Sequence, residues 1–303
     1  MEKINAIQNL RLLPNYGAVP MIAYNEANCA PNRSHTAPSS KVLGCEKSSH
    51  TLSIILIVKN EARCIKRCLD SVAWANEIII LDSGSTDDTV KICKTYTEKV
   101  YQTDWPGFGI QKNRALKKAT GEWILSIDAD EWVSDELKEE IKQIITHSTH
   151  TLFSIPRRTQ YLGEWLYHGD IGKDRVVRLF KRGIVKFTDD VVHESIETSG
   201  QYVGRIKSFL FHDSYESVET LLSRMNQYTT LSAKMRYDRG KTASLKKAIT
   251  HGIWAFLKSY VFRAGFLDGR IGFIAAVSSA ESSYYRYVKL IYFKKNRVAE
   301  RGD

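Results

Sequence analysis

The stretch Trp-Ile-Leu-Ser-Ile-Asp-Ala-Asp-Glu at residues 123–131 decides the fold prediction. An apolar run leads directly into two carboxylates one residue apart, and Thr120 and Gly121 precede it. A short apolar run between polar boundaries is typical of a buried strand in a parallel sheet. About one Asp-x-Asp pair is expected by chance in a chain of this composition. The neighbouring segments therefore decide whether the pair belongs to a functional site.

Strand and helix patterns alternate on both sides of this stretch. Apolar, β-branched runs predict strands at residues 52–58, 77–81, 99–102 and 123–127. One predicted helix follows Asn60, which would cap it, and a second starts near residues 86–88. Two more span residues 108–119 and 134–146, and Ser134 would cap the last of them. This alternation predicts an α/β fold with a single Rossmann-like, mostly parallel sheet flanked by helices and joined by right-handed crossovers.

The pattern changes after residue 151. Shorter strands are predicted at residues 153–155, 176–181 and 185–187, and helices at residues 217–237, 244–263 and 268–293. The last two helices are amphipathic and place aromatic residues among Lys and Arg, as an interfacial membrane helix or a helix packed on the core would. We expect a disordered leader at 1–50, a catalytic domain at 51–215 (nucleotide-binding half 51–131, acceptor half 132–215), and a helical extension at 216–303 that is a candidate for membrane association.

The composition is that of an ordinary globular protein, with 43% hydrophobic and 26% charged residues. Of the net charge of +10, most lies in residues 241–303, which hold 12 Lys and Arg against 4 Asp and Glu. Such a basic region suits nucleic acid, an anionic membrane or an acidic substrate. The five cysteines show no C-x-x-C spacing, which favours a reducing compartment. No run reaches the ~18 apolar residues that span a bilayer.

Polar residues follow three of the predicted strands at their carboxyl ends. Lys59, Asn60 and Glu61 follow the first strand, residues 82–87 follow the second, and the acid pair follows the later one. The carboxyl ends of parallel strands meet at one sheet edge, where such folds bind ligands. The G-x-G-x-x-G and G-x-x-x-x-G-K-[ST] spacings are absent. That absence disfavours a dinucleotide-binding oxidoreductase and excludes a P-loop NTPase.

Residues 54–62, 81–89 and 123–131 resemble the three signature segments of family 2 glycosyltransferases, which have the GT-A fold. Three downstream segments resemble the lipopolysaccharide inner-core β-1,4-glucosyltransferase subgroup: Arg178-Leu179-Phe180, Val192-His193-Glu194 and Gly265-Phe266-Leu267-Asp268-Gly269. The resemblance implies an inverting, metal-dependent transfer of a hexose, expected to be glucose from UDP-glucose, onto the heptose of a lipopolysaccharide core.

The resemblance also implies roles for residues at the strand ends. Val58 and Glu61 would form part of the nucleotide-sugar pocket, and Asp82 would contact uracil or ribose; the alternative for Asp82 is a carboxylate that caps its own turn. Asp128 would bind the nucleotide sugar and act in catalysis. Asp130 would chiefly bind a divalent cation, Mg²⁺ or Mn²⁺.

Three further residues complete the expected site. Lys112 would balance the charge of the diphosphate, unless it lies on a solvated helix face. An inverting transfer needs a carboxylate to accept the proton of the acceptor hydroxyl. Glu194 is the expected base, because it ends a predicted short strand and the resemblance places His-Glu in the active site. His193 would bind the metal or orient the base, or else is a packed histidine. The Q-x-x-R-W motif of processive members is absent, so a single transfer is expected.

The expected partners are a UDP-sugar, a lipopolysaccharide core acceptor and the anionic inner-membrane surface, with no nucleic acid. The expected location is the cytoplasmic face of the inner membrane, as a peripheral protein. Other possibilities are a glycosyltransferase of another surface glycan, a sugar-nucleotide nucleotidyltransferase and a nucleic-acid-binding protein. Nucleotidyltransferases usually carry a Gly-rich basic loop after the first strand, which residues 58–63 lack. The C-terminal aromatics follow helical spacing rather than the pattern of an RNA-stacking sheet.

Overall fold

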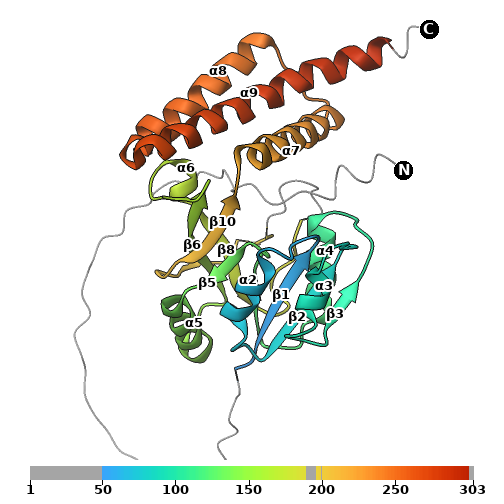
Figure 1. The fold of residues 1–303 in the computed structure, drawn as a ribbon, viewed down its shortest axis with the longest axis vertical. Helices are drawn as coiled ribbons and strands as arrows, with labels where there is room; N and C mark the ends of the chain where they lie inside the picture. Colours follow the sequence, from blue (N-terminus) through green and yellow to red (C-terminus); the bar gives the residue numbers. More distant parts are fainter. Residues whose placement is uncertain (1–49, 189–195, 199, 300–303) are drawn as a thin grey trace, which may run out of the picture. The chain divides into compact units, whose positions relative to one another are not determined.

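The computed structural model describes residues 50–188, 196–198 and 200–299, with side chains described up to residue 293. Its central feature is a ten-stranded sheet with the strand order β3-β2-β1-β4-β8-β6-β10-β5, to which β7 and β9 add by pairing with β6 (Figure 1). Because β1 and β4 lie side by side near the middle, the segments that follow them are brought to the same edge.

The first half of the sheet is parallel, as the sequence predicted. Its strands are β1 (Leu52–Val58), β2 (Glu77–Asp82), β3 (Val100–Gln102) and β4 (Trp123–Ser126). Strand β1 pairs in parallel with β2 and β4, and β2 pairs in parallel with β3. Both faces of β1 are buried, because helix α2 (Ile65–Val72) covers one and helix α4 (Phe108–Lys118) covers the other. Helix α3 (Thr89–Cys93) follows β2.

The second half mixes strand directions. It consists of β5 (Glu131–Val133), β6 (Leu152–Tyr161), β7 (Glu164–Leu166), β8 (Arg175–Lys181), β9 (Gly204–Arg205) and β10 (Leu210–Tyr215). Strand β8 is antiparallel to β4 and β6, whereas β10 is parallel to β6 and antiparallel to β5. Helix α5 (Asp135–His147) begins where predicted, and the Ser134 hydroxyl accepts a hydrogen bond from the Leu137 N–H. The sheet is therefore mixed but mostly parallel, with flanking helices.

Two local predictions are wrong. Helix α2 begins at Ile65 rather than directly after Asn60. Asn60 has a left-handed backbone (φ 54°), and its side-chain oxygen accepts a hydrogen bond from the Thr86 N–H at 2.8 Å, so it joins the loop after β1 to the turn after β2. The predicted strand at residues 185–187 is not formed in the described part of this segment, where Phe187 makes an isolated bridge to Ile196.

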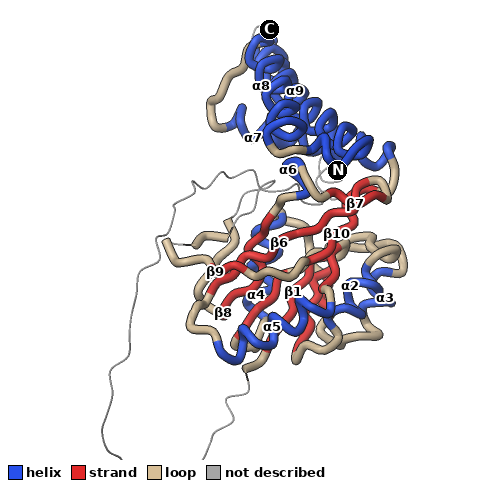
Figure 2. Tube along the Cα trace, turned by 90° about the vertical axis from the view of Figure 1, so that its left-hand side faces the viewer, coloured by secondary structure: helices blue, strands red, loops and turns tan. Residues whose placement is uncertain are grey.

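The C-terminal part is helical, as predicted. It comprises α7 (Val218–Asp238), α8 (Leu245–Leu257), a π-helical turn η1 (Lys258–Phe262), a 3₁₀ turn η2 (Gly265–Asp268) and α9 (Gly269–Ala299). The short helix α6 (Gly169–Gly172), which lies between β7 and β8 in the chain, contacts η1. Helices α7, α8 and α9 pack together beyond the end of the sheet where β6, β7 and β10 extend (Figure 2). Among the helices that the structure describes, none is both long and apolar enough to cross a membrane.

A carboxylate at the start of β2 ties three segments together. Glu77 accepts hydrogen bonds from Ser53 of β1, from the Thr120 N–H at 2.9 Å and from Lys99. Burial alone would raise the pKa of Glu77, but these donors outweigh it and lower the pKa to about 2. Because the folded-state pKa lies below the unfolded value, Glu77 stabilises the fold above pH ~4.5 and loses this effect as the pH falls towards 2.

We expect Glu77→Gln to lower the free energy of unfolding at pH 7 by about 1–2 kcal/mol, after allowance for solvent screening. Urea unfolding at several pH values measures this difference, which should shrink below pH ~5, as Glu77 of the wild type becomes protonated in the unfolded state. The exposed Glu139, paired with Lys142, provides the control, and Glu139→Gln should change stability little. A difference that stays constant with pH would contradict the role given to Glu77.

Candidate functional site

A pocket of about 440 Å³ opens at the carboxyl ends of β1 and β4. Its walls come from the end of β1, the loop after β4, strands β6 and β10, the segment before α4, and helix α7. The lining residues are Ile57, Val58, Lys59, Asn60, Glu61, Trp105, Phe108, Asp128, Ala129, Asp130, Arg157, His212, Glu219, Thr220, Ser223, Arg224 and Gln227. The pocket thus lies at the sheet edge where ligand binding was predicted.

Four of the predicted site residues meet in this pocket: Val58, Glu61, Asp128 and Asp130. Glu61 is buried, its N–H donates to the Thr89 hydroxyl at 2.7 Å, and its carboxylate accepts a hydrogen bond from the Cys64 thiol at 3.2 Å. These contacts fix the loop after β1 against the start of α3. The loop therefore presents a fixed wall to a ligand.

The Asp128 carboxylate is held between two cations. Lys112 Nζ of α4 lies 3.0 Å from Asp128 Oδ1, and Arg178 of β8 forms an ion pair with Asp128 Oδ2. Burial alone would raise the pKa of Asp128, but Arg178 and then Lys112 outweigh it and lower the pKa to about 2. Only 2% of the Lys112 side chain is exposed, so the alternative of a solvated helix face is wrong. Asp128 is therefore ionised at neutral pH, with both oxygens fixed in direction.

Glu131 connects Asp128 and its two cationic partners to the second half of the sheet. Its carboxylate accepts hydrogen bonds from Arg178 at 3.0 Å, from Arg157 at 3.1 Å and from the Asp128 N–H at 2.9 Å. Arg157 also pairs with Asp174, which precedes β8. Buried ions need partners on several sides to offset desolvation, and this chain of contacts supplies them. The acid pair is thus held by side chains from β6, β8 and α4.

Asp130, the second acid of the pair, lies against β10. His212 Nε2 is 3.6 Å from Asp130 Oδ2, and His212 Nδ1 lies 3.3 Å from the Thr159 hydroxyl. The backbone of Asp130 is fixed as well, since its carbonyl accepts a hydrogen bond from the Asp213 N–H at 3.0 Å. Asp130 and His212 are both buried and both line the pocket.

These residues fit a divalent cation that completes its coordination with ligand oxygens. The described residues contain no preassembled group of three or more His, Cys, Asp or Glu side chains suited to a metal. Mg²⁺, however, is commonly bound through one or two protein ligands together with substrate phosphates and water. Asp130 offers a carboxylate and His212 an imidazole nitrogen at the pocket wall, which is a suitable donor set.

Charge balance agrees with a cation at Asp130. The contacts above join three carboxylates, Asp128, Glu131 and Asp174, to three cationic side chains, Lys112, Arg157 and Arg178. The carboxylate of Asp130 contacts His212. A divalent cation at Asp130 would add the positive charge that a bound diphosphate requires.

Asp82 lies at the end of β2, beside Val58 of β1. It is fully buried, and its carboxylate accepts hydrogen bonds from the N–H groups of Gly84 and Ser85 at 3.1 Å each. The pocket lining does not include it. Its carboxylate therefore serves the turn after β2, as the alternative interpretation held, and its contact with uracil or ribose stays a prediction. His193 and Glu194 lie outside the described residues.

Several pocket residues were not predicted from the sequence. His212 lies on β10, a strand that was missed because its central residues, His212, Asp213 and Ser214, are polar. Arg157 follows a proline inside the long strand β6, which the sequence predicted only at residues 153–155. The wall formed by α7 falls within the region assigned to the C-terminal extension. Its members are Glu219, Thr220, Ser223, Arg224 and Gln227. Their spacing of three to four residues marks one helix face, a signal that was available in the sequence.

Comparison with known proteins identifies the family. Residues 53–203 match the glycosyl transferase family 2 domain. The chain is 31% identical over 251 residues to "Uncharacterized glycosyltransferase RP128" of Rickettsia prowazekii (strain Madrid E), covering 79% of this chain and 86% of that relative. It is 27% identical over 246 residues to "Lipopolysaccharide core biosynthesis glycosyltransferase LpsC" of Rhizobium meliloti (strain 1021), covering 79% and 91%.

Among solved structures, S. aureus TarS 1–349 in complex with UDP-GlcNAc matches with a TM-score of 0.44 and 15% identity, covering 81% of this chain and 92% of that chain. The family match and the glycosyltransferase relatives confirm the resemblance found in residues 54–62, 81–89 and 123–131. The chain belongs to glycosyl transferase family 2, and it is a glycosyltransferase.

Proposed function

We propose that this glycosyltransferase transfers a hexose, glucose from UDP-glucose, onto the heptose of a lipopolysaccharide inner core, with inversion and with Mg²⁺ or Mn²⁺. The observation that carries the proposal is the meeting of Glu61, Asp128 and Asp130 in one pocket, with Lys112 Nζ 3.0 Å from Asp128 Oδ1. Such a site can bind a sugar nucleotide through its hydroxyls and its diphosphate.

In this proposal the donor lies along the carboxyl ends of β1 and β4. Val58 and Glu61 would face the nucleoside, because they form the β1 side of the pocket wall. Asp128 would accept a hydrogen bond from a hydroxyl of the donor, since a carboxylate has about four lone-pair sites and its cation partners leave some unused. Lys112 and Arg178 would hold that carboxylate ionised and correctly oriented.

Asp130, together with His212, would hold the divalent cation beside the diphosphate. When bound, the cation supplies Lewis-acid stabilisation of the charge that develops on the departing phosphate. His212 would keep its orientation through the Thr159 hydroxyl, which lies beside its other ring nitrogen.

The transfer would proceed by direct displacement. The acceptor hydroxyl oxygen forms a bond to the anomeric carbon, while the bond from that carbon to the phosphate oxygen breaks and its electron pair leaves with UDP. Glu194 would accept the hydroxyl proton as general base. Attack from the face opposite the leaving group inverts the configuration through an oxocarbenium-like transition state.

The acceptor is proposed from the relatives and from the sequence segments of residues 178–180, 192–194 and 265–269. The LpsC relative is named for lipopolysaccharide core biosynthesis, which supports an acceptor of that class. We place the enzyme at the cytoplasmic face of the inner membrane as a peripheral protein. A glycosyltransferase of another surface glycan is the remaining candidate, because proteins that share a fold can differ in the acceptor that they bind.

A panel of UDP- and GDP-sugars tests the proposal. We expect UDP-glucose to support transfer to truncated core lipid that ends in heptose, and EDTA to abolish it until Mg²⁺ or Mn²⁺ is restored. Mass spectrometry of the lipid reads the transfer, and NMR of the new anomeric proton reads the configuration. Preference for another sugar would overturn the donor assignment. Transfer to a different glycan lipid, with none to the heptose, would favour the alternative acceptor.

A further inference from the structure

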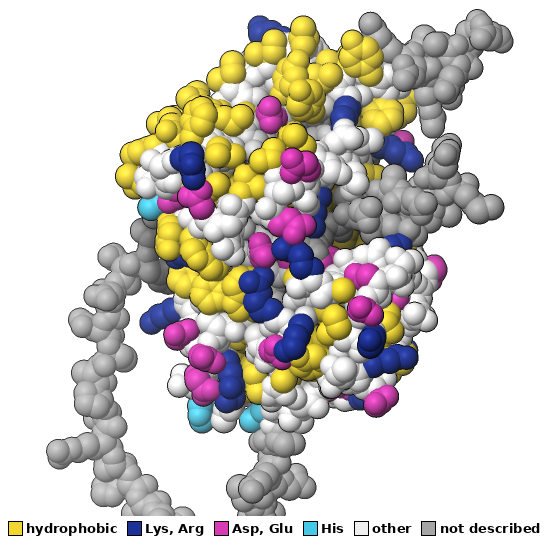
Figure 3. Space-filling view, viewed as in Figure 1, with side chains coloured by type: hydrophobic (Ala, Val, Ile, Leu, Met, Phe, Trp, Pro, Cys, Tyr) yellow, Lys and Arg dark blue, Asp and Glu magenta, His cyan; other side chains and the backbone are white. Residues whose placement is uncertain are grey.

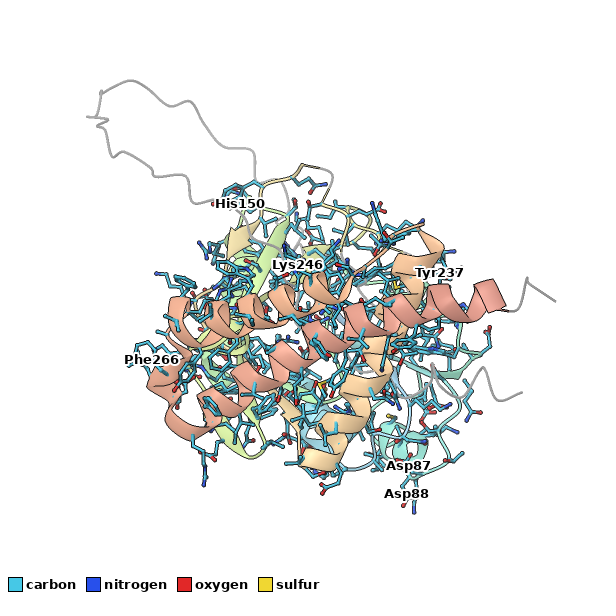
Figure 4. The ribbon with its side chains drawn as sticks, turned by 90° about the horizontal axis from the view of Figure 1, so that it is seen from above. Asp87, Asp88, His150, Tyr237, Lys246 and Phe266 are labelled. Carbon is cyan, nitrogen blue, oxygen red and sulfur yellow. The ribbon has the colours of Figure 1, made fainter. Side chains whose placement is uncertain are left out.

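The turn between α8 and α9 exposes large hydrophobic side chains. This hairpin turn, residues 258–268, includes Val261, Phe262, Phe266 and Leu267, with 48, 67, 50 and 60% of their surfaces exposed. Four such residues within seven positions form a contiguous apolar tip rather than single exposed side chains. Figure 4 shows Phe266 at the end of the helical layer where α8 and α9 meet, far from Lys246 at the start of α8.

One side of helix α8 continues the exposed apolar surface of the hairpin turn. Its exposed hydrophobic residues are Ile249, Ile253, Trp254 and Leu257, which follow helical spacing. The opposite side of α8 carries small residues, and a Cβ added at Gly252 would come within 3.3 Å of Tyr284 on α9. We call these four residues and the four of the turn the apolar face. Figure 3 shows hydrophobic side chains gathered over α8 and α9.

Polar contacts to the segment around α6 hold the hairpin turn in this conformation. The Asp268 carboxylate accepts hydrogen bonds from the N–H groups of Tyr167 and His168 at 2.9 and 2.7 Å. The Arg263 carbonyl accepts one from the Gly169 N–H at 3.0 Å, and Arg263 Nε lies 2.8 Å from Asp170 Oδ1. Because the turn is fixed at both ends, its hydrophobic residues are displayed by the fold and are not exposed by a loose loop.

The helical region that carries the apolar face has an excess of positive charge. Residues 239–293 contain nine Lys and Arg but only two acidic residues, Asp268 and Glu281. Three of these cations pair with acids from outside this range: Lys258 and Arg263 with Asp170, and Arg270 with Glu164. The side chain of Asp268 is only 3% exposed, since it is occupied within the turn. An apolar face beside a field of cations matches an anionic lipid surface, which offers acyl chains below and phosphate above. A second copy of this chain would bring the same positive charges together and would be repelled.

We propose that the apolar face binds the surface of an anionic bilayer, with the hairpin turn inserted among the lipids. The inference deepens the proposed function, because it rests on a membrane-lipid acceptor and identifies the surface that meets the membrane. Trp254 is 55% exposed on this face, and its ring would occupy the interface between head groups and acyl chains. Lys246 and Lys247 are exposed at the α8 end of the apolar face, where they can meet lipid phosphates.

The same contacts link the bilayer surface to the pocket. Helix α6, which is bound to the hairpin turn, leads to Asp174, and Asp174 pairs with Arg157 in the pocket wall. Docking of the turn would therefore hold the β6 and β8 side of the pocket at a fixed orientation to the membrane. A lipid-anchored acceptor then meets the pocket without a search through solution.

Vesicle sedimentation with the full-length chain tests the inference. We expect binding to vesicles of phosphatidylcholine with phosphatidylglycerol, and weak binding to phosphatidylcholine alone. The double variant Phe262→Ser/Phe266→Ser should bind the anionic vesicles at least about tenfold more weakly, because two inserted aromatic side chains are lost. Tyr202→Ser is the matched control, since Tyr202 is 68% exposed, as Phe262 is at 67%, but lies outside the apolar face. It should bind as the wild type does.

UDP binding, measured by calorimetry without vesicles, separates this inference from the proposed function. All variants should bind UDP equally, since Phe262 and Phe266 lie outside the pocket. Loss of vesicle binding with UDP binding retained supports the inference, whether or not the predicted sugar is transferred. Equal vesicle binding by the double variant and the wild type would overturn it. So would a concentration-dependent dimer in sedimentation velocity that the same substitutions dissociate, because the face would then cover a second copy.

Discussion

Asp130→Asn is expected to lower turnover of the sugar nucleotide by at least about 100-fold, because the neutral amide binds a divalent cation poorly and several kcal/mol of leaving-group stabilisation are lost. The amide keeps the size of the side chain and can still accept hydrogen bonds, so the fold should survive. Initial rates of UDP release at several Mn²⁺ concentrations measure the effect. The variant should need far more Mn²⁺ for half-maximal rate.

Two further variants sharpen this test. Asp135→Asn changes an exposed Asp at the start of α5 and should leave both rate and Mn²⁺ dependence unchanged. His212→Ala should raise the Mn²⁺ requirement if the imidazole is a ligand, since a lost ligand or orienting partner typically costs 10–100-fold in metal affinity. Full metal-dependent turnover by Asp130→Asn would show that the cation is bound elsewhere.

Arg178→Met is expected to lower the free energy of unfolding by about 3–5 kcal/mol, because it leaves buried carboxylates without a principal cation. Arg178 pairs with both Asp128 and Glu131, so its loss affects two acids at once. The pKa of Asp128, held at about 2 chiefly by this arginine, should rise. Urea unfolding at neutral pH measures the loss of stability.

Lys181→Met is the control for this variant, because Lys181 lies on the same strand but pairs with Glu122 at the surface. It should change stability by less than ~1 kcal/mol. Arg178→Lys should restore part of the stability, since a lysine keeps the charge but cannot hold two carboxylates in a fork. If Arg178→Met and Lys181→Met cost the same, the buried network does not stabilise the site as described.

The parallel half of the fold could be predicted because its sequence is locally consistent. Strand β1 is apolar at every position but Ser53, and β4 ends at Ser126, two residues before the acid pair. Both patterns are typical of a strand buried on two faces. The predicted cap at Ser134 is confirmed for a similar reason, since its hydroxyl accepts the N–H of Leu137, three residues further along the chain.

The rest of the site depends on pairings that no local pattern encodes. Strand β10 is too polar to be recognised, and it becomes a strand because β5 and β6 flank it. His212 could not be assigned to Asp130 without that pairing. Asn60 is a good helix cap by residue type, yet the turn after β2 captures its side chain through Thr86. Tertiary contacts overrode the local preference in both cases.

The position of Glu131 limits how this protein can have been assembled or recombined. Residue 131 ends the segment that carries the acid pair and also begins β5, and its carboxylate is bound by Arg157 and Arg178 from later strands. The segment proposed to bind the donor is therefore completed by residues from the segment proposed to select the acceptor. An exchange of acceptor segments between relatives must carry both arginines with it. If the proposed roles of the two segments hold, we expect donor and acceptor preferences to change together among relatives, because Glu131 and the two arginines link the segments.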